Sequence, residues 1–137
     1  MRLRFPALCI GLAMLLVACS KDDSASYKEP AIVDLHQRIP LRTSDTATIS
    51  FDEVVSDSRC PANSLCSWAG IAIARFTIRE GKKELPFMLS IMPGYPKQDT
   101  IINGYIIEFS DLKPYPGLTD HLRANPIQAE LRVFKLR

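Results

Sequence analysis

The side chains in this sequence that could do chemistry are few: four cysteines, two histidines and four methionines. Two of the cysteines, Cys60 and Cys66, are separated by five residues. Pro61, Asn63 and Ser64 are turn formers, so the chain can reverse between the two thiols. This spacing favours a structural disulfide that closes a small ring. Such a ring would remove roughly 2–2.5 kcal/mol of unfolded-chain entropy.

Free thiols, redox chemistry and metal binding are the alternatives for this pair. Redox pairs usually read Cys-x-x-Cys, and a zinc site needs about four ligands. His36 and His121 stand far apart and form no His-x-x-x-His spacing that could complete such a site. Met88 and Met92 share one face of a strand, but about 13 Å of strand separates them, so packing is the better reading than copper binding. We therefore expect no metal and no cofactor.

The N-terminal segment reads as a targeting signal. Two arginines lie among the first four residues, and the apolar run Phe5–Val17 is shorter than the roughly 20 residues that span a bilayer. Leu16-Val17-Ala18-Cys19 then matches the bacterial lipobox. We expect residues 1–18 to be a lipoprotein signal peptide and Cys19 to carry the lipid. An ordinary secretory signal with an incidental cysteine is the alternative.

The cysteine count agrees with export. Cys9 lies inside the signal, so Cys9 and the lipidated Cys19 leave one pair, Cys60 and Cys66. Export places that pair in an oxidising compartment, where disulfides persist. The residue after Cys19 is Ser20 and not Asp, which by resemblance to Gram-negative lipoproteins favours the outer membrane; the periplasmic and the surface face both stay open.

Charge and composition limit the classes of partner and separate a polar tether from a folded domain. Removal of the two signal arginines leaves 15 basic against 15 acidic residues, and no basic stripe favours nucleic acid. Membrane attachment should therefore come from the lipid on Cys19, and a further partner would be an envelope protein. Residues 19–29 are polar and read as a flexible tether. Residues 30–137 read as a single domain.

The domain reads as all-β. Short apolar runs with period-two alternation are separated by proline- and glycine-containing turns, and polar Arg79–Lys83 predicts a hairpin. The run Trp68–Arg79 is expected to be the longest strand and to lie centrally, because both faces of its first half are apolar. We expect an antiparallel β-sandwich or small barrel of about six to seven strands with a small disulfide loop. The expected strands are 31–35, 39–42, 46–55, 68–79, 84–92, 100–109 and 127–136.

The segment Asp57–Gly70 carries a resemblance. Its Asp-Ser-Arg-Cys-Pro, followed by Cys-x-Trp-x-Gly, resembles a pattern in small bacterial envelope lipoproteins of uncharacterised function. The later runs Gly104–Ile107 and Pro114–Pro116 fit that pattern loosely. The resemblance implies an envelope location and a β fold, and it implies no activity.

Three residues of this segment are candidates for binding. Asp57 and Arg59 could either brace the loop or form a recognition pair beside it. Trp68 is expected to pack in the core against the disulfide, with ligand stacking as the alternative. Gly70 should let another chain approach closely.

Two classes of function follow. The first is a lipid-anchored binding or structural module of the envelope, with a protease-inhibitor-like module as one version. Its surface would combine Pro61–Leu65 with Pro93–Pro96 or Lys113–Gly117. The second is an enzyme with a dispersed site, for which no catalytic residue stands out. A pocket that gathers a histidine with acidic residues would favour the enzyme.

Overall fold

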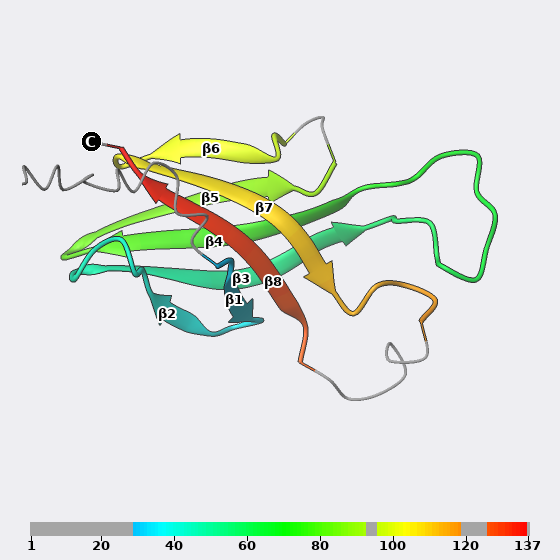
Figure 1. Cartoon of the computed structure of the whole chain (residues 1–137), viewed down its shortest axis with the longest axis horizontal. Coiled ribbons are helices and arrows are strands. Elements are labelled where there is room, and N and C mark those ends of the chain that lie inside the picture. Colours follow the sequence, from blue (N-terminus) through cyan, green and yellow to red (C-terminus); the bar gives the residue numbers. More distant parts are fainter. Residues whose placement is uncertain (1–28, 93–95, 119–125, 137) are drawn as a thin grey trace, which may run out of the picture.

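The computed structural model describes residues 29–92, 96–118 and 126–136. In this part of the chain, eight strands form two four-stranded antiparallel sheets (Figure 1). Each sheet keeps its own two edge strands, so the architecture is a β-sandwich and not a closed barrel. The all-β prediction is confirmed, with eight strands in place of six to seven. The first sheet has the order β1 (Ala31–Asp34), β8 (Gln128–Lys135), β7 (Tyr105–Lys113), β6 (Asp99–Ile102), and the second β2 (Arg38–Pro40), β3 (Ala47–Asp57), β4 (Ala72–Glu80), β5 (Lys83–Ser90).

The core lies between the two sheets and is centred on Phe76 of β4. Its ring stacks on Phe51 of β3 at 5.3 Å between centroids and meets Phe109 of β7 edge-on at 5.2 Å. Such aromatic contacts add to area burial, and the second one joins the facing sheets. Period-two alternation supplies the rest of the buried apolar set, which includes Val33, Ala47, Ile49, Ala72, Ala74, Ile78, Leu89, Tyr105, Ile107, Leu112, Ala129 and Leu131.

Strand β4 is central in its sheet, as expected, because it pairs with both β3 and β5. It begins at Ala72, however, and the expectation that a strand starts at Trp68 was wrong. The longest strand is β3 with 11 residues, against nine for β4. The hairpin predicted at Arg79–Lys83 is present, with Gly81 at φ 60° in its turn.

The single strand expected over Thr100–Phe109 is in fact a hairpin. Asn103 and Gly104 have φ values of 50° and 79° and connect the paired residues Ile102 and Tyr105. Asn-Gly is the preferred pair for two-residue turns that need positive φ at both positions. The turn moves Ile101 to an exposed position, whereas Tyr105 is buried.

Candidate functional site

The segment between β3 and β4, residues 58–71, forms a finger that projects beyond the sheets, and we call it the disulfide loop (Figure 1). Its two arms continue the pairing of the strands: the Ser58 amide donates to the Ile71 carbonyl at 2.9 Å, and the Cys60 amide donates to the Ala69 carbonyl at 2.8 Å. Above this stem, Cys60 and Cys66 are bonded, with their Cα atoms 5.9 Å apart. The loop is therefore a small ring carried on a two-stranded stem.

Gly70 closes the stem. Its φ is +73°, and a Cβ placed there would lie 1.9 Å from the Ser58 carbonyl oxygen. An L side chain is disfavoured at this φ and has no space at this contact. The close approach expected at Gly70 is confirmed, and the approaching chain is the opposite arm of the same loop.

Arg59 is a buried tie at the base of the loop, with 6% of its surface exposed. Its Nε and Nη2 donate to the two carboxylate oxygens of Asp57 at 2.9 and 2.8 Å, and the Asp57 carboxylate also accepts from the Arg59 amide at 3.2 Å. Nη1 donates to the Leu112 carbonyl at 2.8 Å, and Nη2 to the Pro114 carbonyl at 3.3 Å. The guanidinium also lies 4.7 Å from the centroid of the Tyr115 ring.

This geometry favours the bracing role of Asp57 and Arg59 over a recognition role. A two-pronged arginine–carboxylate pair is strong and directional, and here both its groups are used inside the chain. Because Arg59 also bonds to the end of β7, it fixes the stem of the loop to the first sheet. The pair positions the loop and does not face a partner through the Arg59 side chain.

A second loop, residues 114–118, packs on the disulfide loop. The Ala62 amide donates to the Pro116 carbonyl at 2.9 Å. Gly117 has φ +81°, and a Cβ there would lie 2.6 Å from Asn63 Oδ1 and 2.8 Å from the Ala62 nitrogen. Of the two segments expected as alternative neighbours of Pro61–Leu65, the structure brings Lys113–Gly117 against it. Of the other alternative, Pro93–Pro96, residues 93–95 lie outside the described residues.

Trp68 does not pack in the core, and that prediction was wrong. Its side chain is 74% exposed on the returning arm of the loop. Trp68 lies four residues before the start of β4, in the loop that projects beyond the sheets, and the described residues leave most of its indole uncovered. Leu65, inside the ring, is fully exposed. The two large apolar side chains of Leu65 and Trp68 are therefore exposed to solvent on a loop that is fixed at its base.

The sequence included Leu65, Tyr115 and Gly117 only within the candidate surface segments Pro61–Leu65 and Lys113–Gly117, and it gave none of them a role of its own. A signal for Leu65 existed, because it is an apolar residue within the turn-rich ring sequence and belongs to no alternating run. For Tyr115 and Gly117 there was no local signal, since their roles come from contacts with residues more than fifty positions away.

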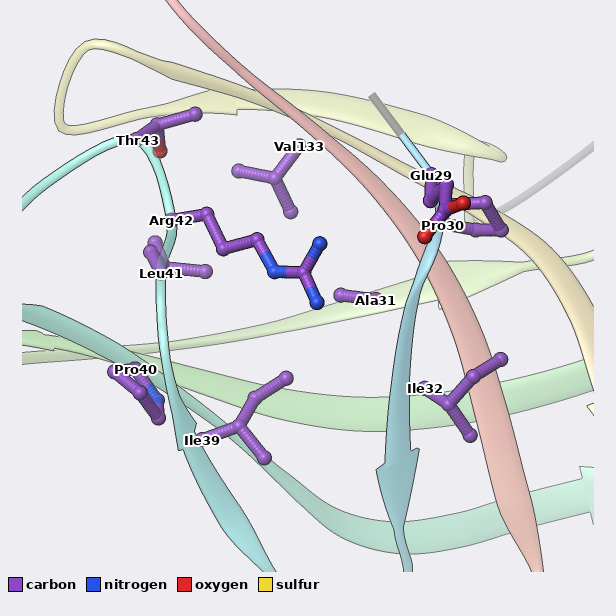
Figure 2. A pocket seen from close by; sticks show the side chains of 10 residues that line it. All are labelled: Glu29, Pro30, Ala31, Ile32, Ile39, Pro40, Leu41, Arg42, Thr43 and Val133. Carbon is purple, nitrogen blue, oxygen red and sulfur yellow. The ribbon is translucent and has the colours of Figure 1, made fainter. Parts of the chain in front are cut away.

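A groove of about 520 Å³ lies elsewhere, between the neighbouring edge strands β1 and β2. Figure 2 shows its mostly aliphatic walls and the Arg42 side chain extending across it toward Ala31. Thr43 contributes a buried hydroxyl that has no hydrogen-bond partner among the described groups. His36 is not among the residues that line the groove, so the combination that would favour catalysis does not occur there.

The remaining sequence candidates give no reaction centre in the described parts of the chain. His36 occupies an exposed turn at φ 65°, and His121 and Cys19 fall outside the described residues. Met88 and Met92, expected to pack, are 43% and 40% exposed. Over residues 29–92, 96–118 and 126–136, no group of three or more His, Cys, Asp or Glu side chains could hold a metal ion.

A search of the same residues for helices finds none long and apolar enough to cross a membrane. Comparison of the chain with protein-family models, with curated proteins and with solved structures finds no match.

Proposed function

We propose that this chain is a lipid-anchored binding module of the cell envelope, and that the disulfide loop is its binding surface. The observation that carries the proposal is the pair of exposed side chains Leu65 and Trp68 on a loop that is fixed at its base. Tryptophan is among the residues most enriched in the energetic centres of protein interfaces. The partner we propose is an envelope protein with an apolar pocket.

The construction of the loop supports this role. A loop that is already ordered loses little conformational entropy when it binds, so more of its contact energy appears as affinity. The disulfide, Gly70 and the buried Arg59 tie each restrict the loop before any partner arrives. Among the described residues, Trp68 makes too little contact to have a packing role, since its side chain is 74% exposed.

The anchor is proposed on sequence alone, from the lipobox at Leu16–Cys19. Lipidation of Cys19 would hold the domain at a membrane, and Ser20 favours the outer membrane. Intact-mass measurement of the protein from the membrane fraction tests this part. We expect a mature chain that begins at Cys19 with added acyl mass, and a Cys19→Ala form that lacks it. A mature chain that starts elsewhere without acyl mass would remove the anchor from the proposal.

Site-specific photocrosslinking in intact envelopes tests the binding surface. A photoreactive phenylalanine analogue placed at Leu65 should capture one discrete protein. The same analogue at Asp45, an exposed turn residue between β2 and β3, is the matched control and should capture none. Capture at both positions, or at neither, would contradict the proposal.

Protease inhibition is a second candidate, favoured by one observation. Leu65 projects from a ring that is closed by a disulfide, which is a rigid way to present a side chain to a protease cleft. Stoichiometric inhibition of a protease that cleaves after leucine, lost on Leu65→Gly, would support it. Rapid cleavage of the loop at Leu65 would exclude it.

A further inference from the structure

The outward face of the first sheet changes from polar to apolar along its strands. Near the disulfide-loop end its side chains are polar except for Ile32 of β1, which is 46% exposed opposite Glu130, and in the middle Arg132 and Glu108 form an ion pair at 3.8 Å. At the other end, Ile101 pairs across the strands with Ile106, and Ile106 pairs with Phe134. We call these three residues, with Leu136, the apolar row.

The side chains of the apolar row lie on the solvent-facing side of the sheet, where polar side chains are usual. The exposed fractions of Ile101, Phe134 and Leu136 are 66%, 38% and 45%. Single exposed apolar residues are ordinary, but side chains that are neighbours on adjacent strands form a continuous patch. Such patches mark sites where proteins contact other proteins or membranes. In β8 the break is sharp, because Glu130 and Arg132 precede Phe134 on the same face.

The position at which the chain enters the domain points to the occupant. In β1, Ala31 pairs with Leu131 and Asp34 with Gln128, so β1 runs toward the disulfide-loop end. Glu29, two residues before Ala31, therefore lies toward Val133, beside the end of β8 that carries Phe134. Cys19 is ten residues before Glu29. Even fully extended, ten residues span at most about 35 Å.

We propose that the apolar row is a membrane-contacting face, which rests on the bilayer into which Cys19 is anchored. This rests on the lipidation of Cys19 given under the proposed function. A short tether keeps the domain near the bilayer at all times, so a modest apolar patch beside the tether is enough to orient it. Phenylalanine, leucine and isoleucine are side chains that enter the headgroup–acyl boundary readily.

This contact sets the direction of the disulfide loop. The hairpin turn at Asn103–Gly104 and the end of β8 lie at one end of the sandwich, and the disulfide loop projects from the opposite end (Figure 1). Because the apolar row occupies only one end of this face, contact through the row dips that end toward the bilayer and leaves Leu65 and Trp68 at the end farther from it, accessible to proteins of the adjoining space.

Fluorescence quenching by brominated lipids tests the orientation. The acylated full chain is purified and reconstituted into vesicles of phosphatidylcholine and phosphatidylglycerol with brominated acyl chains. In the variant Trp68→Phe/Phe134→Trp, the introduced indole should lose emission relative to unbrominated vesicles. The unaltered protein, whose indole is Trp68, is the matched control and should lose none. Trp68→Phe/Ile101→Trp repeats the test at a more exposed position, where substitution is better tolerated.

The outcomes separate this inference from the anchor. Acylated protein whose introduced indoles at 134 and 101 are quenched no more than Trp68 would overturn the membrane face and leave the anchor standing. Quenching of Trp68 in the unaltered protein, without quenching of the introduced indoles, would show that the disulfide loop faces the bilayer and would also overturn the membrane face. A chain that carries no acyl mass overturns both. If the vesicle-bound protein is a dimer and its introduced indoles are not quenched, the apolar row is an interface with a second copy of the chain. That result would also overturn the membrane face.

Discussion

Replacing Gly70 by alanine should damage the stem of the disulfide loop more than an ordinary glycine substitution would. Two effects add at this position. Alanine at φ +73° costs about 1–2 kcal/mol of backbone strain. In addition, its Cβ would lie 1.9 Å from the Ser58 carbonyl oxygen, a backbone atom that cannot turn away.

The size of the second effect follows from the hydrogen bonds that must break when the two arms of the stem move apart to relieve the contact. Three hydrogen bonds join Ser58 and Ile71 at this point: amide to carbonyl at 2.9 Å, and two through the Ser58 hydroxyl at 3.1 and 3.2 Å. Each is worth about 0.5–1.5 kcal/mol net, and exposure places the two hydroxyl bonds at the lower end. We therefore expect Gly70→Ala to lower the free energy of unfolding by about 3–4 kcal/mol.

Gly81→Ala is the matched control. Gly81 also has a positive φ, of 60°, but a Cβ there meets no atom within 4 Å. Gly81→Ala should therefore lower the free energy of unfolding only by the backbone strain, about 1–2 kcal/mol. Urea unfolding followed by far-UV circular dichroism gives both values, since the exposed Trp68 is a poor reporter of folding. Equal losses for the two variants would refute the close-packed stem.

Three further predictions concern the same loop. Arg59→Met should cost about 3 kcal/mol, because it removes the side-chain hydrogen bonds of Arg59 to the Asp57 carboxylate and to two carbonyl groups. Arg75→Met, which breaks an exposed ion pair with Glu53, should cost less than about 1 kcal/mol, and equal costs would contradict the buried role of Arg59. Trp68→Ala should change stability by less than about 0.5 kcal/mol, as at an exposed site, and native Trp68 should emit like an indole in water; a blue-shifted emission would contradict its placement. Cys60→Ser/Cys66→Ser should cost about 2 kcal/mol in the same unfolding assay, and an unchanged midpoint would show that the ring does not constrain the chain.

Alternation of side chains predicted the class of fold because burial on one face of a strand leaves that pattern in the sequence. It placed β4 centrally in its sheet, where the structure has it between β3 and β5. The error over Thr100–Phe109 had a different origin: the Asn103–Gly104 turn signal was present, but the apolar residues on both sides kept the same phase through it. Turn chemistry should have outweighed periodicity there.

The error over Trp68 shows what periodicity leaves out. Trp68 has the same phase as Ala72 and Ala74, so alternation assigns it to the inward face. Whether that face is covered depends on how far the other sheet extends, and this is a property of residues forty or more positions away. The candidate site shares this character. Arg59 and Gly117 acquire their roles from contacts between the disulfide loop and the end of β7, which no local pattern encodes.

The central claim is that Leu65 and Trp68 bind a protein partner. The most direct test purifies the partner identified by crosslinking at position 65 and measures its affinity for variants of the disulfide loop. Leu65→Ala and Trp68→Ala should each weaken binding by about tenfold or more, the loss typical of a central interface residue, with the free energy of unfolding unchanged. Ile101→Ala, an exposed apolar residue on β6, should leave the affinity as it is. Full affinity in the Leu65→Ala/Trp68→Ala double variant would contradict the account.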